Sequence, residues 1–424
     1  MRIHIKQGHL VDPAHQIDKK QDLFISDGQV VAIGKAPEGF QADETIDAKG
    51  KFVFPGLVDL QTRLREPGQE YKATIASETR AAAGGGITTV CLPPDTTPIL
   101  DTPAVIELIH RRNEAAGCAE ILTLGALTQG LGGTQISEMY ELKRAGCVGV
   151  TNARAPIANT LVMRRAMEYA ANFGLTIFLH AEDHSLSKDG CAHEGIISTR
   201  LGLASIPEAA ETMAIARLLM LVEQTGVAAH FCQLSSAKAV QMIHRAQFDG
   251  LPVTADVALH HLYLTEMDIG YFDTNCHVIP PLRSQRDRDG LRDGLLNGTL
   301  HAICSDHQPH DPDAKLAPFS ESEPGMSTLD TLLPLALRLA DETDLSQSDI
   351  ISLLAYQPAK ILGLNIGQLG VGARADLSIF DPEVSWTVSP ETMLSKGKNS
   401  PFLDWELKGQ VSQTLLAGKT AFKR

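Results

Sequence analysis

Short apolar runs alternate with stretches of helical periodicity through the middle of the chain. Eight such runs lie at residues 54–60, 88–92, 121–126, 148–151, 175–180, 227–234, 252–257 and 301–306. The segments between them carry apolar residues at helical spacing, as at Ala237, Val240 and Ile243 after the sixth run. Eight alternating strand and helix units over about 300 residues predict a (β/α)8 barrel rather than a doubly wound sheet, which normally has fewer strands.

Both ends of the chain follow a different pattern. Residues 23–26 and 29–33 are apolar runs separated by Asp27-Gly28, and this dipeptide predicts a hairpin because its turn needs positive φ. Residues 375–380 and 411–416 alternate in the same way near the other end. We therefore expect both ends to be rich in β-strands and poor in helices.

Composition narrows the class of protein. The 424 residues are 43% hydrophobic, which is enough for a large core, and the formal net charge is −14. No basic run is present, so we expect neither a nucleic-acid nor an anionic-membrane surface. No apolar run reaches membrane-spanning length, and residues 1–6 lack the apolar stretch of a signal peptide. Seven widely spaced cysteines without a CxxC pair favour the reducing cytoplasm.

Functional groups of such a barrel are expected where its strands end. The loop at 308–324, rich in Pro, Asp, Glu and Ser, follows the last strand and is either a lid or a solvated loop. Six runs along the chain are distinctive: PGLVDLQTRLREPG at 55–68, GGGITTV at 84–90, PPLR at 280–283, SDHQPH at 305–310, SKGKNSPF at 395–402 and WELKG at 405–409. Together, and in this order, they resemble dihydroorotase.

The resemblance covers nearly the whole chain and implies a fold. Dihydroorotases are cyclic amidohydrolases, and the fold implied is a TIM barrel of the amidohydrolase superfamily joined to a small β-sandwich built from both chain ends. Residues 1–54 would form the first part of the sandwich, 55–365 the barrel and 366–424 the second part.

The resemblance also implies where active members bind zinc, and most of those positions have changed. The expected histidine pair is replaced by Gln61 and Arg63, the carboxylate of an Asp-Asp-Gly run by Asn152 and Ala153, and the histidine of an HxxHxS pattern by Gln233; only His180 and Asp306 are retained. Catalytic zinc normally has three or more protein ligands, and arginine has no lone pair to give. We therefore expect no metal and no other cofactor.

An alternative set of metal ligands is disfavoured by strand geometry. His230 and Cys232 lie on the strand face opposite Gln233, so recruiting them would need the strand to rotate. His260 and His261 match a family run, but we expect them to be packing residues.

Substrate-binding positions have changed as well. Arg65 matches the arginine that holds the substrate carboxylate, although it could equally be a structural ion-pair partner. Pro94 and Ile279 replace asparagines that contact substrate, and Asp95 would repel an anion. The remaining vestigial pocket would contain Arg65, His180 and Asp306. We also expect the fixed charges of Arg63 and Arg154 to pair with Asp306, because an unpaired buried carboxylate is costly.

These losses predict a pseudoenzyme with no catalytic residues. The chain resembles the non-catalytic chain associated with bacterial aspartate carbamoyltransferase, which implies a structural or assembly subunit in de novo pyrimidine biosynthesis. Its partner would be the carbamoyltransferase catalytic chain in a hetero-oligomer, with self-association left open. The alternative is an active dihydroorotase with an atypical, metal-poor site built around Arg65, His180 and Asp306. A third interpretation is a sensor in which Arg65 binds a pathway metabolite.

Overall fold

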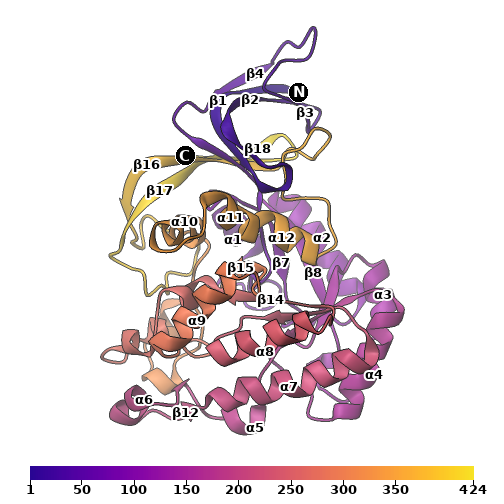
Figure 1. The fold of residues 1–424 in the computed structure, drawn as a ribbon, viewed down its shortest axis with the longest axis vertical. Coiled ribbons are helices and arrows are strands. Elements are labelled where there is room, and N and C mark those ends of the chain that lie inside the picture. The colour runs from indigo at the N-terminus through magenta and orange to yellow at the C-terminus, as the bar shows by residue number, and fades with distance from the viewer.

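The computed structural model describes residues 1–424, and a parallel barrel forms its centre (Figure 1). Eight strands are hydrogen-bonded in the order β15-β14-β13-β10-β9-β8-β7-β6, and a bridge between Thr62 and His307 joins the extensions of the first and last. The barrel predicted from the sequence is confirmed. Its strands are β6 (Leu57–Asp59), β7 (Ile87–Leu92), β8 (Glu120–Ala126), β9 (Gly149–Thr151), β10 (Thr176–His180), β13 (Ala229–Cys232), β14 (Val253–Ala258) and β15 (Ala302–Cys304).

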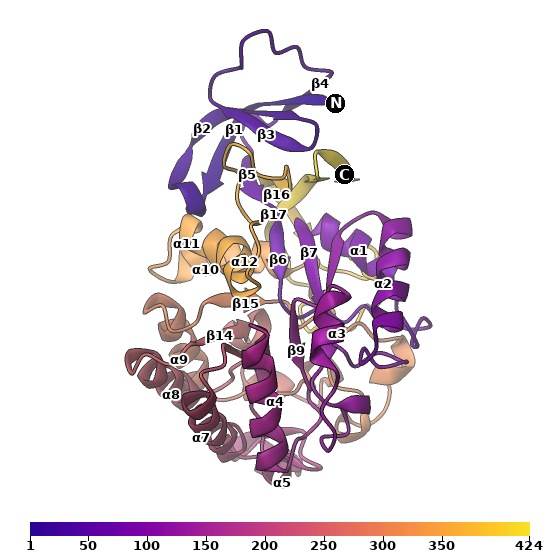
Figure 2. The same cartoon turned by 90° about the vertical axis from the view of Figure 1, so that its right-hand side faces the viewer.

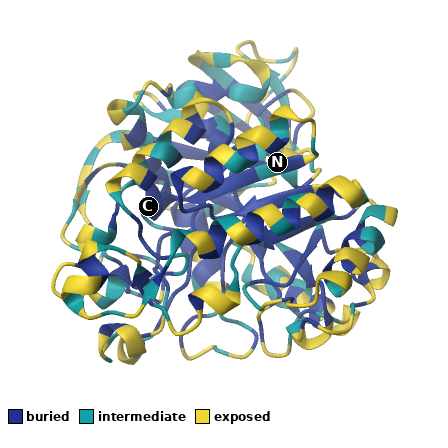
Figure 3. Ribbon diagram, turned by 60° about the horizontal axis from the view of Figure 1, so that its bottom comes forward, coloured by how far each residue is buried: buried dark blue, intermediate teal, exposed yellow.

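Helices cover the outside of the barrel, with exposed residues facing outward and buried residues facing the strands (Figure 3). The predicted helix after the sixth run is α8, in which Val240 and Ile243 are buried. No helix has both the length and the apolar composition needed to cross a bilayer. The covering helices are α1 (Ile75–Gly84), α2 (Pro103–Ala116), α3 (Met139–Arg144), α4 (Thr160–Asn172), α7 (Glu208–Thr225), α8 (Ala237–Phe248), α9 (Gln285–Leu296), α10 (Leu332–Glu342), α11 (Gln347–Ile351) and α12 (Gln357–Ile361).

Strands from both chain ends form a second sheet at one end of the barrel (Figure 2). The two ends of the chain meet where β16 pairs antiparallel with β5, and β4 pairs with β1. The order is β18-β17-β16-β5-β1-β2-β3. The strands are β1 (Arg2–Asp12), β2 (Ile17–Ser26), β3 (Gln29–Ile33), β4 (Glu44–Asp47), β5 (Phe52–Pro55), β16 (Leu377–Thr387), β17 (Glu406–Leu416) and β18 (Lys419–Lys423).

This terminal sheet curls around its own core. Val30 N donates to Ala373 O at 2.9 Å, and Gly372 N donates to Val30 O at 2.8 Å. The edge of β3 therefore meets the segment that leads into β16. Thirteen buried apolar residues lie inside the curl. The strands thus enclose a core as the expected sandwich would, within one hydrogen-bonded sheet. The Asp27-Gly28 turn has φ of 52° and 80°, and the predicted hairpin is confirmed.

Some predicted strands are shorter than expected or divided. The run at 54–60 splits at Gly56, because the chain leaves the terminal sheet at Pro55 and enters the barrel at Leu57. A Cβ at position 56 would lie 2.1 Å from Thr88 Oγ1, so only glycine allows this close passage. The runs at 227–234 and 301–306 end early, where Gln233 and Asp306 adopt positive φ of 54° and 45°.

Candidate functional site

Asp306 lies beyond the carboxyl end of β15 at the centre of a polar cluster. Its side chain is buried, and Oδ1 accepts hydrogen bonds from Gln233 Nε2 at 2.9 Å and Gln308 Nε2 at 3.1 Å. Arg154 Nη2 donates to Oδ2 at 3.3 Å, and Arg63 Nη1 lies 3.6 Å from Oδ1. The expected pairing of both arginines with Asp306 is confirmed. Two amides and two cations therefore surround one carboxylate.

Arg63 and Arg154 place positive charges in a largely buried region around Asp306. Arg63 follows β6, has a side chain only 7% exposed, and donates from Nε to Asp95 Oδ2 at 2.7 Å. Burial would lower the pKa of Arg63, but Asp95 and Asp306 outweigh it and raise the pKa above its usual value. Arg154 follows β9 and also donates to Gln233 Oε1 at 3.0 Å. Burial raises the pKa of Asp306, although Arg154 and Arg63 oppose that change. Both guanidinium groups stay charged beside Asp306.

The other positions expected to have lost a metal ligand are Asn152, Ala153 and Gln61, and none of them has a histidine or carboxylate side chain. Asn152 accepts from Thr128 Oγ1 at 2.6 Å and donates to Ala155 O at 2.9 Å, so its amide is used in holding local loops. Ala153 has no polar side-chain atom. Gln61 is buried, and its Nε2, a donor, has no hydrogen-bond partner. Nothing at these three positions replaces a histidine or carboxylate ligand.

His180 ends β10 with both ring nitrogens buried and unpartnered, although the residue is partly exposed. Its pKa lies well below the usual 6.5, first because of burial and then because Arg154 and Arg63 lie nearby. The imidazole is therefore neutral, and only this residue and Asp306 retain ligand chemistry. Two donors beside two fixed cations do not fit zinc, which normally has three or more protein ligands in a catalytic site.

Arg65 binds a loop of its own chain. Its Nε donates to Pro309 O at 2.9 Å, and its Nη2 lies 3.0 Å from His310 Nε2. Burial and the neighbouring Arg63 lower the pKa of Arg65 to about 10. Lys72 pairs with Glu323 and so holds the other end of the same loop. The loop at 308–324 is thus fastened at both ends, with Phe319 and Ser322 buried within it.

The two positions expected to have lost a substrate contact are Pro94 and Ile279, and both have apolar side chains. Pro94 is buried, and its carbonyl accepts from Leu100 N at 3.2 Å. Ile279 lines a cavity of about 20 Å³ with Glu182 and Arg283. Neither side chain supplies a hydrogen bond to a ligand.

Little space is left at the strand ends. The cavity bordered by Arg63, Arg65 and Asp95 has a volume of about 10 Å³, and the one bordered by Arg154 and His180 has about 50 Å³. Ligand pockets for small molecules usually measure about 300–1,000 Å³. A larger cavity of about 690 Å³ lies elsewhere, between α10 and the terminal sheet. The position of the expected active site is therefore largely filled by its own side chains.

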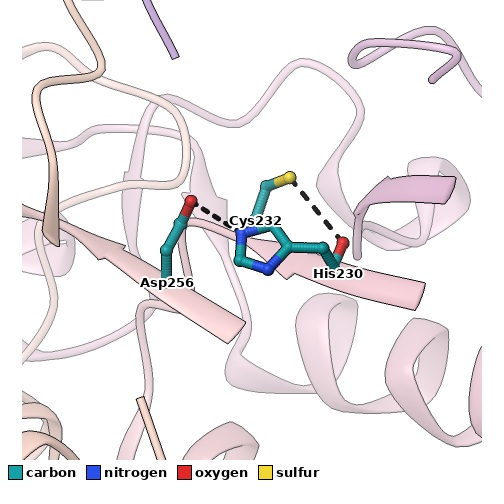
Figure 4. Close-up of side chains that lie close together, drawn as sticks. All are labelled: His230, Cys232 and Asp256. Atoms are coloured by element: carbon teal, nitrogen blue, oxygen red, sulfur yellow. Dashed lines mark hydrogen bonds and ion pairs between the residues drawn. The ribbon is translucent and has the colours of Figure 1, made fainter. Parts of the chain in front are cut away.

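A second cluster of possible metal ligands lies inside the barrel (Figure 4). His230, Cys232 and Asp256 are buried, with their ligand atoms within 4.8 Å of one another. His230 Nε2 lies 3.0 Å from Asp256 Oδ2, and Asp256 Oδ1 accepts from Gln233 N at 2.5 Å. Burial raises the pKa of the Cys232 thiol well above its usual value, so the thiolate that a metal needs is disfavoured. This cluster is a hydrogen-bonded core group that positions Gln233. Asp256 was not predicted from the sequence as a functional residue. Its one distinguishing feature there is that it is an acidic residue within the apolar run at 252–257.

Comparison with known proteins relates this chain to dihydroorotase-like sequences and to a solved hydantoinase structure. A family model described as "Dihydro-orotase-like" matches residues 50–239. A Pseudomonas aeruginosa protein named "Dihydroorotase-like protein" is 49% identical, covering 99% of both chains. A Syntrophotalea carbinolica protein named "Dihydroorotase" is 43% identical, covering 100% of this chain and 99% of its own. The solved structure of L-hydantoinase (dihydropyrimidinase) from Arthrobacter aurescens has a TM-score of 0.88 and 25% identity, covering 99% of this chain and 96% of that one.

Proposed function

Because this chain belongs to the dihydroorotase-like family of the amidohydrolase superfamily, we propose that it is a catalytically inactive member with a structural role. It acts as an assembly subunit of an aspartate carbamoyltransferase complex in de novo pyrimidine biosynthesis. Its partner is the carbamoyltransferase catalytic chain, which it supports without performing chemistry.

The proposed loss of activity rests on one observation: the guanidinium groups of Arg63 and Arg154 both lie beside Asp306. Arg154 Nη2 and Arg63 Nη1 lie 3.3 and 3.6 Å from its two carboxylate oxygens. A divalent cation placed at this carboxylate would face two like charges that cannot be removed by deprotonation. The same carboxylate also accepts from Gln233 and Gln308, so its lone pairs are engaged. An aspartate in this state is a structural anion rather than a base that moves protons.

The proposed assembly role is supported by the preserved fold of the chain. The barrel retains a continuous core of 77 buried residues, and both chain ends still form their shared sheet. A protein that keeps its fold while its reaction site is filled is expected to act through its surface. The identity of the partner comes from the family resemblance.

An active dihydroorotase with an atypical, metal-poor site is the competing function. It is favoured by relatives at 43% and 41% identity that carry the name "Dihydroorotase". Metal analysis of the purified chain, combined with assays of dihydroorotate opening and N-carbamoyl-aspartate closure, separates the two. We expect no stoichiometric zinc and no turnover above the uncatalysed rate. Stoichiometric zinc with turnover would overturn the proposal.

Assembly is tested in the host cell. Deleting the gene for this chain is expected to reduce the mass of the carbamoyltransferase on a sizing column with light scattering. Restoring the wild-type chain is expected to restore that mass. A transferase of unchanged mass in the deletion strain would contradict the assembly role, whatever the activity assays show.

A further inference from the structure

Three loops at the carboxyl ends of the barrel strands carry large apolar side chains that face solvent. Ile196, Met267, Tyr271, Phe272 and Leu316 are 83%, 62%, 101%, 45% and 79% exposed. These five residues are called the apolar loop face below. They follow β10, β14 and β15, the strands that also position His180, Asp256 and Asp306.

Contacts between the loops place the three loops side by side. A Cβ on Gly195 would lie 3.1 Å from Glu266 Oε2, so the start of α6 (Ile196–Leu201) lies beside the loop that holds Met267. Thr274 Oγ1 donates to Lys315 O at 2.8 Å, and Lys315 Nζ donates to Thr274 O at 3.0 Å. That pair joins the loop of Tyr271 to the loop of Leu316. Figure 1 draws α6 at the end of the molecule away from the terminal sheet.

The composition of this face is that of an interface centre. Single exposed apolar residues are ordinary, but neighbouring Ile, Met, Tyr, Phe and Leu side chains expose area whose burial is worth about 25 cal/mol per Å². Tyrosine, phenylalanine and methionine are enriched in the buried centre of protein interfaces, while charged residues are depleted there.

The surrounding residues are strongly acidic. Eight carboxylates lie in the stretches 194–200, 266–273 and 311–323, at Glu194, Glu266, Asp268, Asp273, Asp311, Asp313, Glu321 and Glu323. The same stretches contain two basic residues, Arg200 and Lys315, and Lys315 Nζ is engaged with the carbonyls of Thr274 and Glu323. Two copies of such a face would repel each other. A partner with a basic rim around an apolar centre is complementary.

Contacts made by Arg65 and Lys72 also hold part of the apolar loop face in a fixed position. Arg65 holds Pro309 and His310, and Lys72 holds Glu323, so the loop that carries Leu316 is fastened at both ends. A surface ordered before binding loses less conformational entropy when a partner docks. Arg65, which matches the arginine that holds the substrate carboxylate in active relatives, thus supports a docking surface in this chain.

We propose that the apolar loop face, with its acidic rim, is where the carbamoyltransferase catalytic chain docks, through a surface with a basic rim and an apolar centre. This inference rests on the proposed function and deepens it by locating the interface.

The test compares two charge-introducing double variants. Met267→Lys/Leu316→Lys alters the apolar loop face, and Met213→Lys/Met220→Lys alters α7, where the side chains are similarly exposed at 57% and 65%. Binding of each full-length chain to purified carbamoyltransferase catalytic chain is measured by calorimetry, after thermal melting has verified folding. The face variant is expected to bind at least ten-fold more weakly than wild type. The α7 variant is expected to bind as wild type does.

The rim is tested separately. Asp313→Asn/Glu321→Gln changes two exposed carboxylates that make no hydrogen bond within the chain. It is expected to slow association severalfold and to weaken the dependence of the association rate on salt. An unchanged rate and salt dependence would remove the rim from the interface.

The outcomes separate this inference from the proposed function. If the wild-type chain does not bind the catalytic chain, the assembly role and its interface both fail. If wild type binds and the face variant binds equally well, the face is wrong while the assembly role stands. If the wild-type chain alone is a dimer and the face variant a monomer, the face joins two copies of this chain and the inference is overturned.

Discussion

Asp306 is a buried carboxylate whose native environment contains more than one positive charge. Replacing it by asparagine would leave Arg63 and Arg154 facing each other without an anion between them. Breaking a buried ion pair by removing one partner costs about 3–5 kcal/mol, and Asp306→Asn is expected to destabilise the chain by about that much. Urea unfolding of the purified chain measures the change.

A matched variant separates charge from shape. Arg63→Met/Asp95→Asn/Arg154→Met/Asp306→Leu removes all four charges of the cluster together, and such replacements are often neutral or stabilising. It is expected to recover most of the stability lost in Asp306→Asn. Equal stability of Asp306→Asn and wild type would show that the ion cluster does not hold the filled pocket.

Glu78 links three distant segments and predicts sensitivity to acid. Burial alone would raise its pKa, but hydrogen bonds from His307 and Ser395 outweigh burial and hold the pKa below the usual 4.5. A carboxyl whose folded pKa is depressed stabilises the fold above its unfolded pKa, and this contribution is lost as pH falls through the folded pKa. Below about pH 4.5, Glu78→Gln is therefore expected to lose less stability with falling pH than wild type does. Parallel slopes in unfolding curves recorded across that range would contradict this.

The polar partners at single residues were only partly predictable. Charge complementarity alone predicted that Arg63 and Arg154 pair with Asp306. The partners of Arg65 were not predictable, because Pro309 and His310 lie more than 240 positions away and are brought near by barrel closure. Asp95 was expected to repel a ligand, yet its charge is used by Arg63. Long-range pairing depends on where strands end, which the pattern of apolar residues gives only approximately.

Within elements, Gly409 of β17 is a sensitive position. It has φ of 89°, and a Cβ there would lie 2.0 Å from Phe380 Cζ. Gly409→Ala is expected to cost about 3 kcal/mol, from backbone strain and from overpacking against that ring. Gly50→Ala is the control, since its φ is 77° and no atom lies within 4 Å of the added Cβ; it is expected to cost only about 1 kcal/mol. Equal losses in chemical denaturation would exclude the clash.

Element positions were more predictable than element ends. Each of the eight predicted runs overlaps one barrel strand, because each is apolar enough to be buried on both sides; five runs enclose their strand, and three fall one residue short of it at one end. The ends were missed where a non-glycine residue adopts positive φ, as Gln233 and Asp306 do. Ala153 and Arg65, which also follow barrel strands, share this conformation, with φ of 48° and 64°. Such strain concentrates at functional sites and has no sequence signature when glycine is absent.

At the scale of the whole molecule, stability is expected to be independent of metal. Ligands that bind only the native state raise the melting temperature, and their removal lowers it. Dialysis against EDTA is expected to leave the melting temperature of this chain unchanged within about 1 °C. A metal-dependent dihydroorotase treated in parallel is the control. A clear drop for this chain would reveal a bound structural metal.

The pairing of β5 with β16 has a consequence for synthesis. Pro55 and Leu377 are register partners, and roughly 320 residues separate them along the chain. Ribosomes add about 5–20 residues per second, so the edge of β5 stays unpaired for roughly 15–65 s before its partner strand β16 is synthesised. During that interval an unpaired strand edge is open to wrong pairing, so chaperones have a defined segment to protect. A chain truncated before Leu377 would keep this edge open permanently and would stay exposed to wrong pairing.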